Sequence, residues 1–378
     1  MVNPRSSTVR DQKIAGLTTR DRLSRTARLV GFQILNPAEL NFVLEKGYPI
    51  ELVAADEGYI YDFELLKRAL EKLPTDSAMV ENVHCIGIAR MSSNHVRKLV
   101  FLEEDKAFVQ WEEARKSLSD FSIASLKGYD RNLRKIVEPR WFDPDKTPKR
   151  VIEEHWRNSS EKGTNEWVAM RLHPVPQNLL TTWLWNFPVI TPNAVTAFNI
   201  LISFAAVGFF FKGHFIPGCI LGNIVGITDG VDGKLARTTV RFSKFGYYLD
   251  HVSDQVCEVL WYLAIGWGLR FFVQWPMDPF LLSWILIAFY TIDRMTTGLF
   301  SKIKGVELHD FRKWDRVIRV YGARRNHNFL MLFVGALMDR FAQAFLLVLV
   351  YTAMTAFIKV MRYLWIEWKG LQTDRSVS

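Results

Sequence analysis

Six apolar stretches in the second half of the chain limit its possible folds more than any other feature. They cover about residues 192–211, 215–237, 244–272, 279–300, 327–338 and 341–364, the fifth of them short. A helix of about 20 apolar residues crosses a bilayer and satisfies its own backbone hydrogen bonds there. The sequence therefore predicts an α-helical polytopic membrane domain with six transmembrane helices over residues 191–378.

Basic residues in the connecting segments predict how these helices are oriented. Lysine and arginine crowd the segments after the second and fourth stretches and recur in the tail, whereas the opposite loops offer only Lys212, Arg270 and Arg340. Cytoplasmic loops carry the excess of positive charge, so both termini and the inner helix ends are expected in the cytoplasm, with the protein in a cell inner membrane.

Met1–Asp21 lacks the apolar core of a signal peptide, so insertion is expected to begin internally. Lysine and arginine in the cytoplasmic loops of a protein in a lipid bilayer then explain most of the net charge of +9, and no nucleic-acid partner is expected.

Residues 1–165 have the mixed, charged composition of a soluble domain. Helical spacing and cap-like residues predict helices over Leu17–Gly31 and Asp62–Leu73. Short apolar runs suited to strands lie at Phe32–Leu35, Ile50–Ala55 and Val83–Ala89, and a second charged helical region fills residues 105–165, including Lys149–Arg157. Strands alternating with helices predict a small α/β cytoplasmic domain.

Residues 166–190 are expected to connect the two domains. The segment Lys162–Asn165 has the composition of a linker. The stretch that follows brings Leu179, Leu180, Trp183 and Leu184 together on one side of a helix. We interpret this stretch as an amphipathic helix lying at the cytoplasmic face of the bilayer. The alternative is a buried helix of a soluble domain.

Four aspartates stand near the inner ends of the second and third apolar stretches. They are Asp229, Asp232, Asp250 and Asp254. Carboxylates at membrane depth are costly and therefore mark a candidate functional site. Spacings of three and four residues put each pair on one face of its helix. If the two faces pack together, four carboxylates converge, and Mg²⁺ or Mn²⁺ would offset their repulsion through the oxygen ligands that these ions prefer.

The stretch from Asp229 to Asp254 resembles the signature of the CDP-alcohol phosphotransferase (CDP-alcohol phosphatidyltransferase) family. That signature reads D-x2-D-G-x2-A-R-x8-G-x3-D-x3-D, and every fixed position is filled here. The resemblance implies that the hydroxyl of a small polyol or polyol phosphate attacks a CDP-alcohol such as CDP-diacylglycerol, and that CMP leaves. Inositol phosphate and glycerol phosphate are the leading acceptor candidates. It also implies two Mg²⁺ or Mn²⁺ ions per site and a homodimer.

The resemblance assigns roles to individual residues. Asp229, Asp232 and Asp250 would be metal ligands, and Asp254 would touch the second metal and act as general base. Contacts to the CDP-alcohol donor are expected from Asn193, Thr196, Gly233, Ala236, Arg237, Ser243 and Gly246. Helix capping is an equal alternative for the two hydroxyl residues and the asparagine, and helix packing is the alternative for the glycines.

Several basic residues are candidates for binding a phosphate on the acceptor. These are Arg241, Lys244, Arg324 and Arg325, for which ordinary positive charge on cytoplasmic loops is the alternative. The dipeptide Asp293-Arg294 is expected either to form a buried pair with a neighbouring helix or to contact substrate.

The N-terminal domain resembles, more distantly, a sugar-phosphate cytidylyltransferase. The resemblance rests on Val53-Ala-Ala-Asp56 before a helix and on Gly87-Ile-Ala-Arg90. The glycine-rich loop that cradles nucleotide phosphates is absent near the N-terminus, so we expect a degenerate domain without nucleotidyl transfer. Two alternatives stay open: a bifunctional enzyme with cytidylyltransferase activity, and an intramembrane metal-ion transporter, whose carboxylates would be spread across the bilayer.

Overall fold

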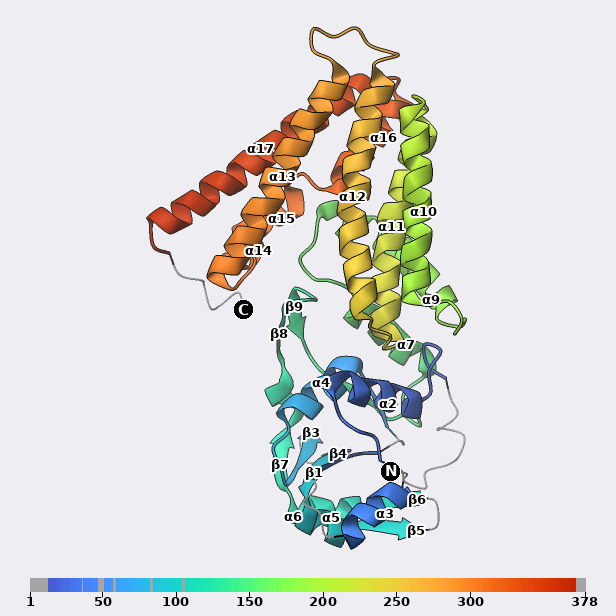
Figure 1. Ribbon diagram of the computed structural model, residues 1–378. Coiled ribbons are helices and arrows are strands. Elements are labelled where there is room, and N and C mark those ends of the chain that lie inside the picture. The colour runs from blue at the N-terminus through green and yellow to red at the C-terminus, as the bar shows by residue number, and fades with distance from the viewer. Residues whose placement is uncertain are drawn as a thin grey trace. The chain divides into compact units, whose positions relative to one another are not determined.

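Figure 1 shows a computed structural model of the chain as a ribbon coloured from the N- to the C-terminus. The structure describes residues 13–35, 37–46, 51–56, 59–81, 84–103 and 106–371. The chain divides into two compact units, each discontinuous in sequence. The first is Met1–Glu161, Thr182–Val189 and Lys234–Phe242, and the second is Lys162–Thr181, Ile190–Gly233 and Ser243–Ser378.

The first unit consists of short helices and strands, which confirms a mixed α/β architecture. Its helices are α2 (Thr19–Val30), α3 (Pro37–Glu45), α4 (Phe63–Lys72), α5 (Ser93–Leu99), α6 (Trp111–Ser117) and α7 (Lys149–Ser159), with the 3₁₀ turn η1 (Ile123–Leu126). Its strands are β1 (Glu51–Ala55), β2 (Ile60–Tyr61), β3 (Ser77–Glu81), β4 (His84–Ser92), β5 (Val100–Glu103), β6 (Lys106–Val109), β7 (Ser119–Ser122), β8 (Gly128–Asp130), β9 (Lys135–Val137) and β10 (Trp141–Phe142).

One four-stranded sheet organises this unit, in the order β1-β4-β3-β7. Pairings β1–β4 and β3–β4 are antiparallel, and β3–β7 is parallel. Alternate strand residues face opposite sides: Ala78 packs with residues of α5 and α6, and Met79 packs with residues of α4. The sheet therefore has a buried core on both faces.

Local signals in the first unit predicted helices better than strands. Helix α2 begins after Thr18, whose side chain accepts a hydrogen bond from the Asp21 amide, and ends at Gly31 with φ of 91°. The strand expected over Phe32–Leu35 is wrong, because these residues are coil. The region 105–165 was also misjudged: it holds α6 and α7 but mostly short strands and turns. Strands of two to four residues are too short to show a reliable period.

Long helices make up the second unit, and their bounds follow the predicted apolar stretches closely. They are α10 (Pro192–Phe211), α11 (Phe215–Thr238), α12 (Lys244–Leu269), α13 (Pro279–Lys304), α16 (Arg325–Leu337) and α17 (Phe341–Trp368). Shorter helices accompany them: α8 (Trp167–Arg171), α9 (Pro174–Leu184), α14 (Leu308–Phe311) and α15 (Asp315–Tyr321). The last residues of α9 and of α11 belong to the first unit.

The core of the second unit lies among its long helices. Helix α12 packs against α10 and α13, and α17 packs against α13 and α16; α10, α11 and α12 run side by side in Figure 1. Aromatic side chains such as Trp261, Tyr262 and Phe329 fill the interior. Among the described residues, two helices, α10 and α17, are long and apolar enough to cross a membrane.

Candidate metal centre

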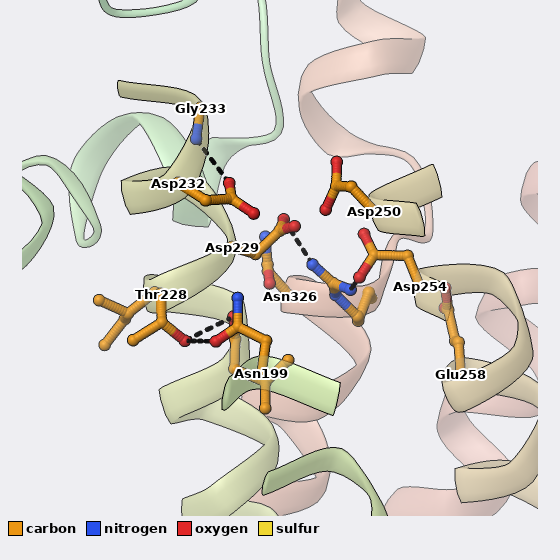
Figure 2. Close-up of polar contacts among 12 residues, drawn as sticks. Asn199, Thr228, Asp229, Asp232, Gly233, Asp250, Asp254, Glu258 and Asn326 are labelled. Carbon is orange, nitrogen blue, oxygen red and sulfur yellow. Dashed lines mark hydrogen bonds and ion pairs between the residues drawn. The ribbon is translucent and has the colours of Figure 1, made fainter. Parts of the chain in front are cut away.

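Two neighbouring helices bring three of the four aspartates together. Asp229 lies on α11, and Asp250 and Asp254 lie one turn apart on α12. One carboxylate oxygen from each of the three lies within 4.8 Å of the others. Figure 2 shows these side chains turned toward one another. All three are half-buried, so the predicted convergence of acidic groups holds for this trio.

The fourth aspartate, Asp232, is held by other partners. Its Oδ2 accepts a hydrogen bond of 2.6 Å from the Thr196 hydroxyl on α10, and its Oδ1 accepts one of 2.5 Å from the Gly233 amide. Asp232 is buried beside the trio, and Figure 2 shows its carboxylate pointing into the same space. Thr196, expected at the donor site, thus contacts the acidic cluster through Asp232.

A guanidinium bridges the two helices at the cluster. Arg325, the first residue of α16, donates from Nη1 to Asp254 Oδ1 and from Nη2 to Asp229 Oδ2, both at 2.6 Å. Short, charge-assisted bonds of this kind fix both position and orientation. Arg325 was expected to bind an acceptor phosphate; in the structure it instead contacts Asp229 and Asp254, two of the predicted metal ligands.

The donor set fits a hard divalent cation. Three carboxylates from two helices supply only oxygen ligands, the type that Mg²⁺ and Mn²⁺ prefer. Their oxygens are close enough to share ions, and the rigid helices that carry them limit how far they can separate.

Residues expected to contact the donor fall into two groups. In the second unit, Asn193 lies against Gly246: a Cβ at position 246 would be 2.1 Å from Asn193 Oδ1. Thr191, rather than Asn193, is the N-cap of α10. Ser243 is the N-cap of α12 and accepts a 3.1 Å hydrogen bond from the Gly246 amide, so its capping role is confirmed.

The motif residues beyond Gly233 belong to the first unit. Ala236 is half-buried. Arg237 donates from Nε to the Ser160 carbonyl at 2.8 Å, and Arg241 donates from Nη1 to the Pro188 carbonyl at 2.7 Å. Both arginines therefore have structural partners within that unit.

The two other basic candidates lie in the second unit. Lys244 is exposed at the first turn of α12. Arg324 is the N-cap residue of α16 and lines a small pocket with Arg319 and Lys359. The predicted buried pairing of Asp293-Arg294 is confirmed: Asp293 pairs with Lys359 of α17 at 2.5 Å, and Arg294 pairs with Glu258 of α12 at 3.7 Å.

Sequence reasoning missed a fifth carboxylate. Glu258 lies one turn beyond Asp254 on α12 and is buried; Figure 2 shows it below Asp254. It accepts a 3.2 Å hydrogen bond from the Tyr262 hydroxyl, which in turn accepts one of 2.9 Å from Asn328. The four-residue spacing from Gly246 through Asp250 and Asp254 continues to Glu258 and was the signal available to find it.

Comparisons with known proteins agree with the motif. Residues 189–308 match the sequence model of the family described as CDP-alcohol phosphatidyltransferase. The bifunctional IPC transferase and DIPP synthase of Aquifex aeolicus is 23% identical over 274 residues, covering 71% of this chain and 60% of that protein. The archaetidylinositol phosphate synthase of Pyrococcus horikoshii is 36% identical over 91 residues, covering 23% of this chain and 46% of that protein. The chain thus spans 60% and 46% of the lengths of these relatives.

A solved structure resembles part of the chain. The crystal structure of Mycobacterium tuberculosis phosphatidylinositol phosphate synthase in complex with manganese and citrate aligns with a TM-score of 0.38 and 17% identity, covering 51% of this chain and 88% of that chain. Residues 189–308 of this chain match the CDP-alcohol phosphatidyltransferase family.

Proposed function

We propose that this protein transfers a substituted phosphate group from a CDP-alcohol to a hydroxyl of a polyol phosphate, releasing CMP. One observation carries the proposal: carboxylate oxygens of Asp229, Asp250 and Asp254 lie within 4.8 Å of one another, at the motif of a family that performs this reaction. Positioning and charge neutralisation are the main requirements of phosphoryl transfer.

The acidic residues have distinct roles in the proposed reaction. Asp229, Asp250 and Asp254, with Asp232 as fourth ligand, would hold two Mg²⁺ or Mn²⁺ ions, which when bound would neutralise the donor diphosphate. Asp254 serves as general base. Arg325 occupies its Oδ1, so Oδ2 is the atom that accepts the proton of the attacking hydroxyl.

A phosphate on the acceptor is supported by a cationic pocket. Arg319, Arg324 and Lys359 line it, together with His309 and Asp315. Arg324 of this pocket and Arg325 of the acidic cluster are consecutive residues at the start of α16. Guanidinium and ammonium groups suit a phosphate monoester. One relative is named for archaetidylinositol phosphate, which favours an inositol phosphate over glycerol phosphate as the acceptor.

The membrane arrangement proposed here has six spans with both termini and the acidic cluster on the cytoplasmic side. The lysine- and arginine-rich connections support it. Helix α9 supports an interfacial position, because Val175, Leu179 and Trp183 are exposed along one side. This exposure disagrees with the alternative of a buried soluble helix. A homodimer stays a prediction from the family resemblance.

We propose no nucleotidyl transfer for the N-terminal domain. The relative from Aquifex aeolicus aligns with 71% of the chain, whereas residues 190–378 are half of it, so the alignment must include part of this domain. The name of that relative includes the word bifunctional, but the glycine-rich phosphate loop is missing from this sequence. The full-length protein incubated with labelled CTP and inositol phosphate is expected to release no pyrophosphate; release would support a second activity.

The central test is CMP release by the purified full-length protein. With labelled CDP-diacylglycerol and Mn²⁺, we expect CMP only when a polyol phosphate is present, and we expect Asp254→Asn to abolish release. The matched control is Asp278→Asn, an exposed aspartate paired with Arg270. Acceptor-independent release, or full turnover by Asp254→Asn, would reject the assigned roles. Manganese uptake into vesicles without CMP release would favour a transporter.

A further inference from the structure

Helix α9 has its polar side chains buried and its apolar side chains exposed. Gln177 and Thr181, one turn apart, are 8% and 1% exposed, whereas Val175 and Leu179 are each 68% exposed. A helix of a soluble protein would show the reverse pattern, whereas a helix at a bilayer interface turns its apolar side toward lipid and its polar side toward the protein. The polar side of α9 therefore faces the second unit, where Gln177 contacts α11.

The contacts lead to a row of glycines on α11. Gly218, Gly222, Gly226 and Gly230 recur every four residues and so share one face of the helix. A Cβ on any of them would collide with a side chain from a neighbouring helix. The colliding side chains are Phe210 at Gly218, Phe329 at Gly222, Asn326 at Gly226 and Gln177 at Gly230. Small residues at such spacing let neighbouring groups approach the helix backbone.

The closest approach on this face is made by Gln177. A Cβ at Gly230 would lie 2.0 Å from Gln177 Nε2, and that nitrogen donates a 3.1 Å hydrogen bond to the Ile227 carbonyl of α11. A side chain at position 230 would push the Gln177 amide out of this position. Gly230 follows Asp229 directly, so Gln177 is fixed to the turn of α11 that carries the first aspartate of the cluster.

A second set of contacts joins the same segment to the cluster from α16. Asn326 lies against Gly226 and donates a 3.0 Å hydrogen bond to Glu166 Oε1, which precedes α8. Asn326 follows Arg325, the residue that bridges Asp229 and Asp254. The segment from Glu166 to Gln177 thus contacts both α11 and α16 next to the residues that form the cluster.

We propose that Gln177 is a positioning residue that sets the place of Asp229 in the metal centre. It acts through its hydrogen bond to the Ile227 carbonyl and its close contact with Gly230. Gln177 lies outside residues 189–308, the segment that matches the family. The inference rests on the proposed function, because it needs the acidic cluster to be a metal site.

A double-mutant cycle on the full-length protein tests this inference. Gln177→Ala, Gly230→Ala and the double variant are compared for Mn²⁺ affinity, measured by electron paramagnetic resonance of free Mn²⁺, and for kcat and KM of CMP release. We expect Gln177→Ala to weaken Mn²⁺ binding severalfold, and Gly230→Ala to weaken it further. When Gln177 is already alanine, Gly230→Ala should reduce the Mn²⁺ affinity by a factor at least about fivefold smaller than it does in the wild-type background, as expected for residues in contact.

The controls separate positioning from general damage. Gly208→Ala, on α10, places its Cβ within 4 Å of no other group and should leave Mn²⁺ affinity unchanged. Gln177→Met fills similar space without the N–H donor and should weaken binding like Gln177→Ala. If Gly230→Ala fails to fold, a double variant that folds still supports the coupling.

Three results would overturn the inference, and a fourth would separate it from the proposed function. Unchanged Mn²⁺ affinity in Gln177→Ala, or an equal effect of Gly230→Ala in both backgrounds, overturns it. A wild-type chain that binds no Mn²⁺ overturns it too, because there is then no metal site to position. A wild-type chain that shows the coupling in Mn²⁺ binding but releases no CMP rejects the proposed reaction and leaves the positioning role supported.

Discussion

At the scale of single residues, the acidic cluster is an unbalanced set of charges. When ionised, Asp229, Asp250 and Asp254 contribute three negative charges and Arg325 one positive charge, which leaves an excess of two negative charges before the neighbouring Asp232 is counted. In a half-buried site such charges repel one another more strongly than in water. The cluster therefore favours bound cations, because a single guanidinium neutralises only one of these carboxylates.

Arg325→Gln is expected to impair the reaction without unfolding the protein. The variant loses both charge-assisted bonds, so Asp229 and Asp254 are no longer held to one another across α11 and α12. We expect kcat for CMP release to fall by at least about tenfold, equivalent to 1.4 kcal/mol of lost transition-state stabilisation. The control Arg340→Gln removes an exposed arginine before α17 and should keep wild-type turnover; an equal loss in both variants would contradict the prediction.

His173 gives the second unit a pH-dependent element of stability. Burial is the main cause that lowers the pKa of His173 below its usual 6.5, an effect that nearby Glu166 partly offsets. The unfolded chain then takes up a proton near pH 6.5, before the folded chain does. The free energy of unfolding should therefore fall as the pH drops from about 6.5 toward the lower pKa of the folded state. Above about pH 6.5, His173 should have no effect on the pH dependence of stability.

The measurement compares thermal midpoints at pH 7.5 and pH 5.5. His173→Gln should lose less stability on acidification than the wild type, because glutamine does not titrate. His214→Gln, which replaces an exposed histidine, should show the wild-type difference between the two pH values. A wild-type difference in His173→Gln would mean that the burial of this imidazole has no consequence for stability.

At the scale of elements, helix bounds were predictable wherever an apolar run met a capping residue. Helix α10 begins with Thr191 as N-cap and Pro192 next, and α12 begins after Ser243. The aspartate trio was predictable for the same reason, since spacing along a helix fixes which side chains share a face. Contacts between helices were not predictable in this way. The local sequence does not indicate that Gln177 contacts Gly230, because that contact depends on how α9 packs.

A buried ion pair joins α13 to α17 and is expected to be sensitive to the loss of one partner. Lys359 and Asp293 are both buried and lie 2.5 Å apart. Lys359→Met leaves the Asp293 charge without its partner, at a cost of about 3–5 kcal/mol in the free energy of unfolding. The double variant Lys359→Met with Asp293→Leu should recover most of that stability, because the two charges are removed together.

The same two helices offer a matched control. Lys304 and Glu367 also join α13 to α17, at 2.9 Å, but both side chains are partly exposed. Lys304→Met should cost less than about 1 kcal/mol, because solvent screens the pair. Denaturant unfolding in detergent would distinguish the two variants. Equal costs would show that burial does not set the strength of these pairs.

At the scale of the whole molecule, the boundary between the two units falls inside α11. Residues Phe215–Gly233 of this helix belong to the second unit, and its end, from Lys234, belongs to the first. In the first unit, Arg22 of α2 donates to the Thr238 carbonyl and Arg25 donates to the Thr239 carbonyl, both at 2.8 Å. These are carbonyls at the C-terminal end of a helix, which otherwise lack partners. The N-terminal domain therefore completes the helix that carries Asp229 and Asp232.

Removing that cap should destabilise the protein even though it lies outside the catalytic residues. Arg22 is buried, and its guanidinium carbon lies 3.7 Å from the ring centre of Trp156. Arg22→Gln is expected to lower the free energy of unfolding by roughly 1.5–3 kcal/mol, the usual value of a hydrogen bond from a charged donor. Arg28→Gln, an exposed position on the same helix, should have little effect. A chain beginning at residue 162 lacks α2 and α7 and should unfold at a lower temperature than Arg22→Gln. If that shortened chain kept the full wild-type thermal midpoint, the N-terminal domain would have no part in holding the end of α11.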